Sequence, residues 1–213
     1  MPRRALNRTT ELRSRVAEEA ARIMREQGVR DFLLAKRKAA DRLGIVDRNA
    51  LPANQEISEA LAAQQRLFGG SAHRDNVRAL RETALQAMDL LARFKPRLVG
   101  PVLAGTATPH SDVSLHLFAP TPEEVAFLLI ERAVRYRTGD RRVRLPGGEH
   151  ASYPNFEFEL GQVTIEATVF PDLGLREAPL CPIGGGPMHR ARRAEVAALL
   201  DEGPDDGPDE DEP

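Results

Sequence analysis

The sequence predicts a mixed α/β protein, in which an N-terminal helical module precedes a small mixed sheet with flanking helices. Apolar residues recur every three or four positions through much of residues 9–94, which is the period of amphipathic helices. Apolar and polar residues then alternate through residues 112–118 and 156–169, which is typical of half-buried strands. We expect about five or six strands, the usual size of one sheet.

The size and composition of the chain limit its class. A length of 213 residues fits one medium domain, or one domain with a helical extension. No apolar run approaches the ~18 residues of a membrane span, and the basic N-terminus lacks the apolar stretch of a signal peptide. Cys181 is the only cysteine, which excludes an intrachain disulfide and a Cys-rich zinc site. We therefore expect a cytoplasmic protein without a membrane partner.

The charge is distributed unevenly along the chain. Residues 201–213 hold eight acidic residues and no basic one, so the total of −2 leaves residues 1–200 at +6. We expect this Pro/Gly-punctuated segment to be a disordered acidic tail. The positive net charge of residues 1–200 would suit binding of phosphate groups or nucleic acid. Alternatively, these basic residues only form a solvated helical surface.

Three helices are expected in the N-terminal module, residues 1–70. Each begins at a capping residue and ends at glycine, the usual pattern of helix ends. Their expected ranges are 9–28, 31–44 and 54–70. The second carries the basic run 36–38, for which nucleic-acid binding and a plain exposed face both remain open.

The second domain, residues 71–200, is expected to contain the sheet. A helix over 75–94 leads into a strand at 97–104, a loop, a strand at 112–118 and a helix over 121–133. A short hairpin follows, with strands at 134–137 and 141–145 and a turn at 138–140. In the strand at 112–118, alternation separates three apolar side chains from Asp112, Ser114 and His116.

A second hairpin is expected around the turn 161–162, where glycine stands first. This turn sets the register, so that Phe158 pairs with Ile165 and Glu157 lies opposite Glu166. Like charges directly opposite each other are unfavourable. A cation between them, a basic residue from a neighbouring strand or solvent exposure would each remove the penalty.

Residues 97–118 carry a resemblance to a known family. Gly105-Thr106, a short loop and then Ser-Asp-Val-Ser-Leu at 111–115 resemble the signature of the nucleotidyltransferase (DNA polymerase beta-like) superfamily. In that family a Gly-Ser turn holds the nucleotide phosphates, and a Ser-Asp-x-Asp strand supplies two metal-binding carboxylates. The resemblance matches Gly105 and Thr106 to the turn, Asp112 to the first carboxylate and Ser114 to the position of the second.

The resemblance also implies a third carboxylate, on a later strand beside the Ser-Asp strand. Glu166 is matched to it first and Glu157 second. On this basis we expect Mg²⁺ or Mn²⁺ at Asp112, Glu166 and Glu157, with Asp112 and Glu166 as the catalytic pair. The implied nucleotide contacts are Gly105, Thr106, Ser111, Ser114, Arg141 and Arg142.

Because Ser114 is neutral, the metal site is expected to be degenerate, since two-metal chemistry needs two or three carboxylates. The predicted function is a nucleotidyltransferase-like protein that binds a nucleoside triphosphate or is non-catalytic. One alternative is an active metal-dependent transferase acting on RNA, a protein or a small molecule. The other is an adaptor that binds RNA or a protein through its basic helices and the arginines of 141–144.

Overall fold

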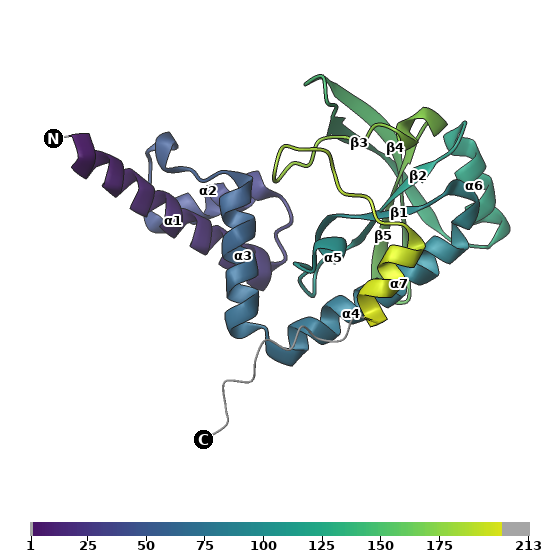
Figure 1. Cartoon of the computed structure of the whole chain (residues 1–213), viewed down its shortest axis with the longest axis horizontal. Coiled ribbons are helices and arrows are strands. Elements are labelled where there is room, and N and C mark those ends of the chain that lie inside the picture. Colours follow the sequence, from purple (N-terminus) through teal and green to yellow (C-terminus); the bar gives the residue numbers. More distant parts are fainter. Residues whose placement is uncertain (1, 202–213) are drawn as a thin grey trace. The chain divides into compact units, whose positions relative to one another are not determined.

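The computed structural model describes residues 2–201, without the side chains of residues 2–8 and Arg48. Within this range the chain forms seven α-helices and one five-stranded mixed sheet (Figure 1), which confirms the mixed α/β class. The predicted acidic tail lies outside the described residues, except for Asp201, which ends the last helix. No helix of the described chain is long and apolar enough to cross a membrane.

The chain forms two compact units, each assembled from several segments. Unit 1 comprises residues 2–76, 106–111 and 181–186, and unit 2 comprises 77–105, 112–180 and 187–201. Neither unit is therefore one continuous stretch of sequence.

Unit 1 is helical. It contains α1 (Pro2–Gln27), α2 (Phe32–Leu43), the 3₁₀ helix η1 (Arg48–Ala50), α3 (Asn54–Phe68) and the first turns of α4 (Gly70–Leu90). Its core is made of small and aliphatic side chains, including Val16, Ile23, Ala39, Ile57 and Leu61.

Side chains of unit 1 also hold its two separate segments. The Gln65 side-chain amide donates to the Thr106 carbonyl at 2.9 Å, and the Asn54 side-chain amide donates to the Pro182 carbonyl at 2.8 Å.

The predicted limits of the second helix are confirmed. The Leu34 N–H donates to Asp31 Oδ1 at 2.6 Å, and Gly44 ends the helix in the left-handed region at φ 65°. The predicted end of the first helix at Gly28 is also confirmed, since α1 ends at Gln27 and Gly28 has φ 65°. Two expected starts are wrong, because α1 begins at Pro2 rather than residue 9, and α4 at Gly70 rather than residue 75.

Removal of the α2 cap gives a first testable outcome. Asp31→Ala should lower the free energy of unfolding of unit 1 by about 1 kcal/mol, because the Leu34 N–H loses its acceptor. Urea unfolding followed by far-UV circular dichroism measures it. Asp41→Ala, an exposed change in the same helix, should stay within about 0.5 kcal/mol of the wild type. Equal losses in the two variants would contradict a capping role.

Unit 2 contains the sheet, whose strand order is β1-β2-β5-β4-β3. The strands are β1 (Arg97–Val99), β2 (Val113–Phe118), β3 (Tyr136–Arg144), β4 (His150–Leu160) and β5 (Val163–Phe170). Strands β2 and β5 are parallel, and the other neighbours are antiparallel. The helices of this unit are the rest of α4, then α5 (Gly100–Ala104), α6 (Pro122–Glu131) and α7 (Arg193–Asp201).

Two expected strands differ from the structure. The strand expected over 97–104 ends at Val99, and residues 100–104 form α5. Pro101 favours a helix start because its missing N–H needs no partner in the first turn, and Gly105 ends α5 at φ 74°. The hairpin expected around 138–140 is wrong, since β3 runs unbroken from Tyr136 to Arg144. Its turn lies further on, where the Leu145 N–H donates to the Glu149 carbonyl at 2.8 Å.

The register of the second hairpin is confirmed. Phe158 pairs with Ile165, and Glu157 lies opposite Glu166, as the turn at 161–162 predicts. Strand β3 lies on the outer side of β4, at the edge of the sheet.

The two faces of the sheet differ in polarity. One face is buried and apolar, with Leu98, Leu115, Leu117, Phe158 and Ile165 among its residues. Helices α4 and α6 lie along the sheet in Figure 1 and bury apolar side chains, which suits them to cover this face. The opposite face bears the polar residues of the candidate site.

Candidate functional site

The candidate site is the polar face of the sheet in unit 2. Residues directly opposite each other on neighbouring strands share a face, so the register assigns its members. Two rows cross it, the first Ser114, Glu166, Glu157 and Arg137, and the second Arg97, His116, Thr168 and Asn155. Phe118 and Phe170 form a further pair beyond His116 and Thr168.

The carboxylates matched to the family lie on or next to this face. Asp112 directly precedes β2 and is buried, with 9% of its surface exposed. Glu166 on β5 is the direct neighbour of Ser114 on β2. The strand that carries the matched third carboxylate therefore does lie beside the Ser-Asp strand.

Arginines from β3 accompany the two facing glutamates. Arg141 lies 3.5 Å from Glu166, and Arg137 lies 3.5 Å from Glu157. Of the three ways to relieve the repulsion between these glutamates, the structure uses basic residues of a neighbouring strand. Arg142 alternates with Arg141 along β3, so it lies on the other face of the strand, where it is exposed.

Whether these residues suit a divalent ion depends on how many ligand side chains lie close together. Among residues 2–201 there is no group of three or more His, Cys, Asp or Glu side chains that could hold a metal ion. Asp112, Glu166 and Glu157 thus do not form a three-carboxylate group, and two of them already have arginine counter-ions. The described residues therefore hold no three-carboxylate group of the kind that the resemblance implies for Mg²⁺ or Mn²⁺.

The residues matched to the phosphate-binding turn fall on either side of a boundary between the two units. Gly105 ends α5 in unit 2, while Thr106 and Ser111 belong to unit 1. The Ser111 hydroxyl accepts a hydrogen bond from the Thr108 N–H at 2.9 Å, which uses it within a local turn.

A different glycine turn adjoins β2. Val99 is the β-sheet partner of Ser114, and Gly100 follows it at φ 75° as the first residue of α5. A Cβ atom at Gly100 would lie 3.9 Å from Ser114 Cβ, so this turn passes close to the strand. Gly100 was not predicted to belong to the site, although Gly-Pro after an apolar run is a usable turn and helix-start signal.

His116 is the buried titratable group of the polar face, with 5% of its surface exposed. Its Nδ1 accepts a hydrogen bond from Arg190 Nε at 3.0 Å. Burial lowers the pKa of His116 to about 3, with further contributions from the positive charges of Arg190 and Arg141. The ring is therefore neutral at physiological pH, and Nε2 carries its proton.

Arg190 crosses the end of this face. Its guanidinium lies 5.2 Å and 5.1 Å from the ring centres of Phe118 and Phe170. Its Nη1 donates to the Gly174 carbonyl at 2.6 Å. These contacts fix the side chain between β2, β5 and the 3₁₀ helix η3 (Asp172–Leu175).

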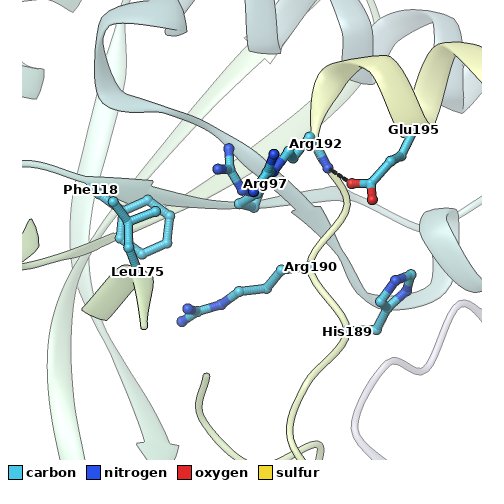
Figure 2. Close-up of a pocket in the computed structure, with 7 residues that line it drawn as sticks. All are labelled: Arg97, Phe118, Leu175, His189, Arg190, Arg192 and Glu195. Carbon is cyan, nitrogen blue, oxygen red and sulfur yellow. Dashed lines mark hydrogen bonds between the residues drawn. The ribbon is translucent and has the colours of Figure 1, made fainter. Parts of the chain in front are cut away.

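Next to Arg190 is a cavity of about 560 Å³, which we call the arginine pocket. Figure 2 shows its lining residues, Arg97, Phe118, Leu175, His189, Arg190, Arg192 and Glu195. This group was not predicted from the sequence, because its arginines are far apart in the chain and only folding brings Arg97 to the segment before α7.

Comparison with known protein families, with curated proteins and with solved structures finds no match to this chain. Any functional inference for this chain therefore rests on the residues of the polar face and of the arginine pocket.

Proposed function

We propose that this chain is a nucleotide-binding protein of the nucleotidyltransferase type with a degenerate metal site, which binds a nucleoside triphosphate without transferring it. The observation that carries this proposal is the position of Glu166 beside Ser114, which is two residues after Asp112. The succession of α4, β1, a glycine turn and β2 supports it too, because the family core likewise begins with a helix leading into the strand before its glycine turn.

The non-catalytic part of the proposal rests on charge. Ser114 contributes a neutral hydroxyl where the family has a carboxylate, and Arg141 and Arg137 neutralise Glu166 and Glu157. Transfer by two metal ions needs anionic ligands that stabilise both the attacking and the leaving oxygen. With its carboxylates paired to arginines, the polar face is better suited to hold a nucleotide than to activate one.

The first alternative is an active transferase that uses Mg²⁺ or Mn²⁺ at Asp112 and Glu166. It requires Arg141 to leave Glu166, which is feasible because the Arg141 side chain is 56% exposed. Labelled nucleotide would then be transferred to RNA, a protein or a small molecule.

The second alternative is an adaptor that binds RNA or a protein. Arg37 and Lys38 are exposed on α2, and Arg142 and Arg144 are exposed on the edge strand β3. Lys36 is partly buried, and burial lowers its pKa, so it is the least available of the basic run. Charge reversal at Arg37 and Lys38 should weaken RNA binding only if this alternative holds.

The test is a calorimetric melt with each nucleoside triphosphate, with and without Mg²⁺ or Mn²⁺. Ligand at ~100 times its Kd adds about 2.7 kcal/mol, so the Tm should rise by roughly 5–10 °C. The rise should vanish in Asp112→Asn, which keeps the size of the side chain and removes its charge. Asp140→Ala, an exposed change on β3, is the control and should keep the rise.

Three other outcomes would contradict the proposal or favour an alternative. No rise with any nucleotide would overturn the proposal. An equal rise in wild type and Asp112→Asn would remove Asp112 from the nucleotide site. Transfer of label to RNA, protein or a small molecule would establish the active alternative instead.

A further inference from the structure

The arginine pocket gathers positive charge that forms no ion pair within the described part of the chain. Within the described range 2–201, none of the guanidiniums of Arg97, Arg190 and Arg192 forms an ion pair with a carboxylate. Arg97 donates instead to the carbonyls of Lys95 and Pro96, both at 3.0 Å.

The partners of Arg190 are also uncharged. They are the neutral His116 ring, the carbonyls of Gly174 and Glu177, and two phenylalanine rings. Its Nη2 is buried and has no hydrogen-bond partner within residues 2–201. An unsatisfied buried donor is unfavourable, so the Arg190 guanidinium keeps donor capacity that its protein contacts do not use.

One carboxylate lines the pocket and balances its charge only in part, since burial and Arg192 lower the pKa of Arg97 while the charge of Glu195 raises it. Glu195 accepts a hydrogen bond from the backbone N–H of Arg192 at 2.5 Å, which uses it at the start of α7 (Figure 2). Three arginines and a single carboxylate therefore line the pocket.

The arginines also repel one another. Burial lowers the pKa of Arg97, and the charge of Arg192 lowers it further. Burial likewise lowers the pKa of Arg190 to about 10, with an added contribution from Arg97. An anion between these side chains would relieve this repulsion, because it would interact favourably with all three.

We propose that the arginine pocket is a second ligand site of unit 2, which binds the phosphate group of a small organic phosphate. Three arginines suit a phosphate dianion, because guanidinium N–H groups form charge-assisted hydrogen bonds to its oxygens. The cavity of about 560 Å³ is far larger than one phosphate group and lies within the usual range of small-molecule sites. Phe118 and Leu175 give it an apolar wall against which the organic part of the ligand packs.

This inference does not rest on the proposed nucleotide site, because it uses neither Asp112 nor Glu166. The experiment therefore uses probes that contain no nucleoside and no metal. Phenyl phosphate, inorganic phosphate and succinate are titrated separately into the full chain by isothermal titration calorimetry. Phenyl phosphate tests the phosphate group and the apolar wall together, and succinate tests whether any dianion suffices.

Matched variants locate the binding. Arg192 is exposed, so Arg192→Gln removes one pocket charge with little risk to folding. Arg193→Gln removes the same charge from the next residue, which lies outside the pocket and pairs with Asp89. We expect Arg192→Gln to lower the affinity for phenyl phosphate about tenfold or more, because one charge-assisted contact is lost. Arg193→Gln and Asp112→Asn should bind phenyl phosphate like the wild type.

Three results would overturn the proposal. The first is no measurable binding of phenyl phosphate by the wild type. The second is an equal loss in Arg192→Gln and Arg193→Gln, which would indicate attraction by general positive charge. The third is binding of succinate or inorganic phosphate as tightly as phenyl phosphate, which would remove the specificity for an organic phosphate. Loss of binding in Asp112→Asn alone would instead assign the ligand to the nucleotide site.

Discussion

Leu115→Ala should lower the free energy of unfolding of unit 2 by about 3 kcal/mol, the middle of the range for buried leucine truncations. Leu115 has no exposed surface and lies on β2 between Leu98 of β1 and Ala167 of β5. Its removal leaves a cavity on the apolar face, directly behind the strand that carries Ser114 and His116. The large loss follows because a rigid sheet cannot close around the missing atoms.

Tyrosine fluorescence measures this change in unit 2 alone. The chain has no Trp, and its two tyrosines, Tyr136 and Tyr153, are on β3 and β4. Urea unfolding followed by this signal should shift to lower urea in Leu115→Ala. Leu173→Ala is the control, because Leu173 is 80% exposed and its truncation should cost no more than about 0.5 kcal/mol. Similar losses in both variants would mean that Leu115 is not packed as described.

Acid should destabilise unit 2 through His116. The folded-state pKa of about 3 lies below the ordinary 6.5, so between these values the unfolded chain binds a proton that the folded chain excludes. Stability therefore falls as the pH falls through 6.5, and this contribution stops growing near pH 3. Between about pH 7 and about pH 5, the expected loss from this group is about 2 kcal/mol.

The matched variant for this prediction is His116→Asn. The asparagine Oδ1 can accept the hydrogen bond of Arg190 in place of Nδ1, but the side chain does not titrate. Urea unfolding by tyrosine fluorescence at a series of pH values should show a shallower acid loss in the variant. Parallel curves for the two proteins would contradict a buried neutral histidine, whatever the absolute stability of the variant.

Local sequence signals predicted the elements that depend on local chemistry. Asp31 and Gly44 mark the ends of α2 because each satisfies backbone groups of that helix alone. The hairpin register of β4 and β5 follows from one two-residue turn, which fixes every pair beyond it. Where two local signals competed, the prediction was wrong, since the turn at 145–149 replaces the one expected at 138–140.

The candidate site was predictable only in part, because its parts meet across the sheet. The position of Glu166 beside Ser114 came from a resemblance, and the pairing of Glu166 with Arg141 was one of three open alternatives. Arg190 carries no local motif, and its contacts with His116 and the two phenylalanine rings join residues far apart in the sequence. Such a group becomes visible only when long-range strand order is known.

The division of the chain into interleaved segments has a consequence for how this protein can be altered. Residues 106–111 and 181–186 belong to unit 1 but interrupt the sequence of unit 2. No single cut in the chain therefore separates the two units. A fragment ending near residue 70 would deprive the side-chain amides of Gln65 and Asn54 of the carbonyls of Thr106 and Pro182. The two halves are thus poor candidates for exchange as independent modules, and any recombination with another protein must carry all the segments of a unit together.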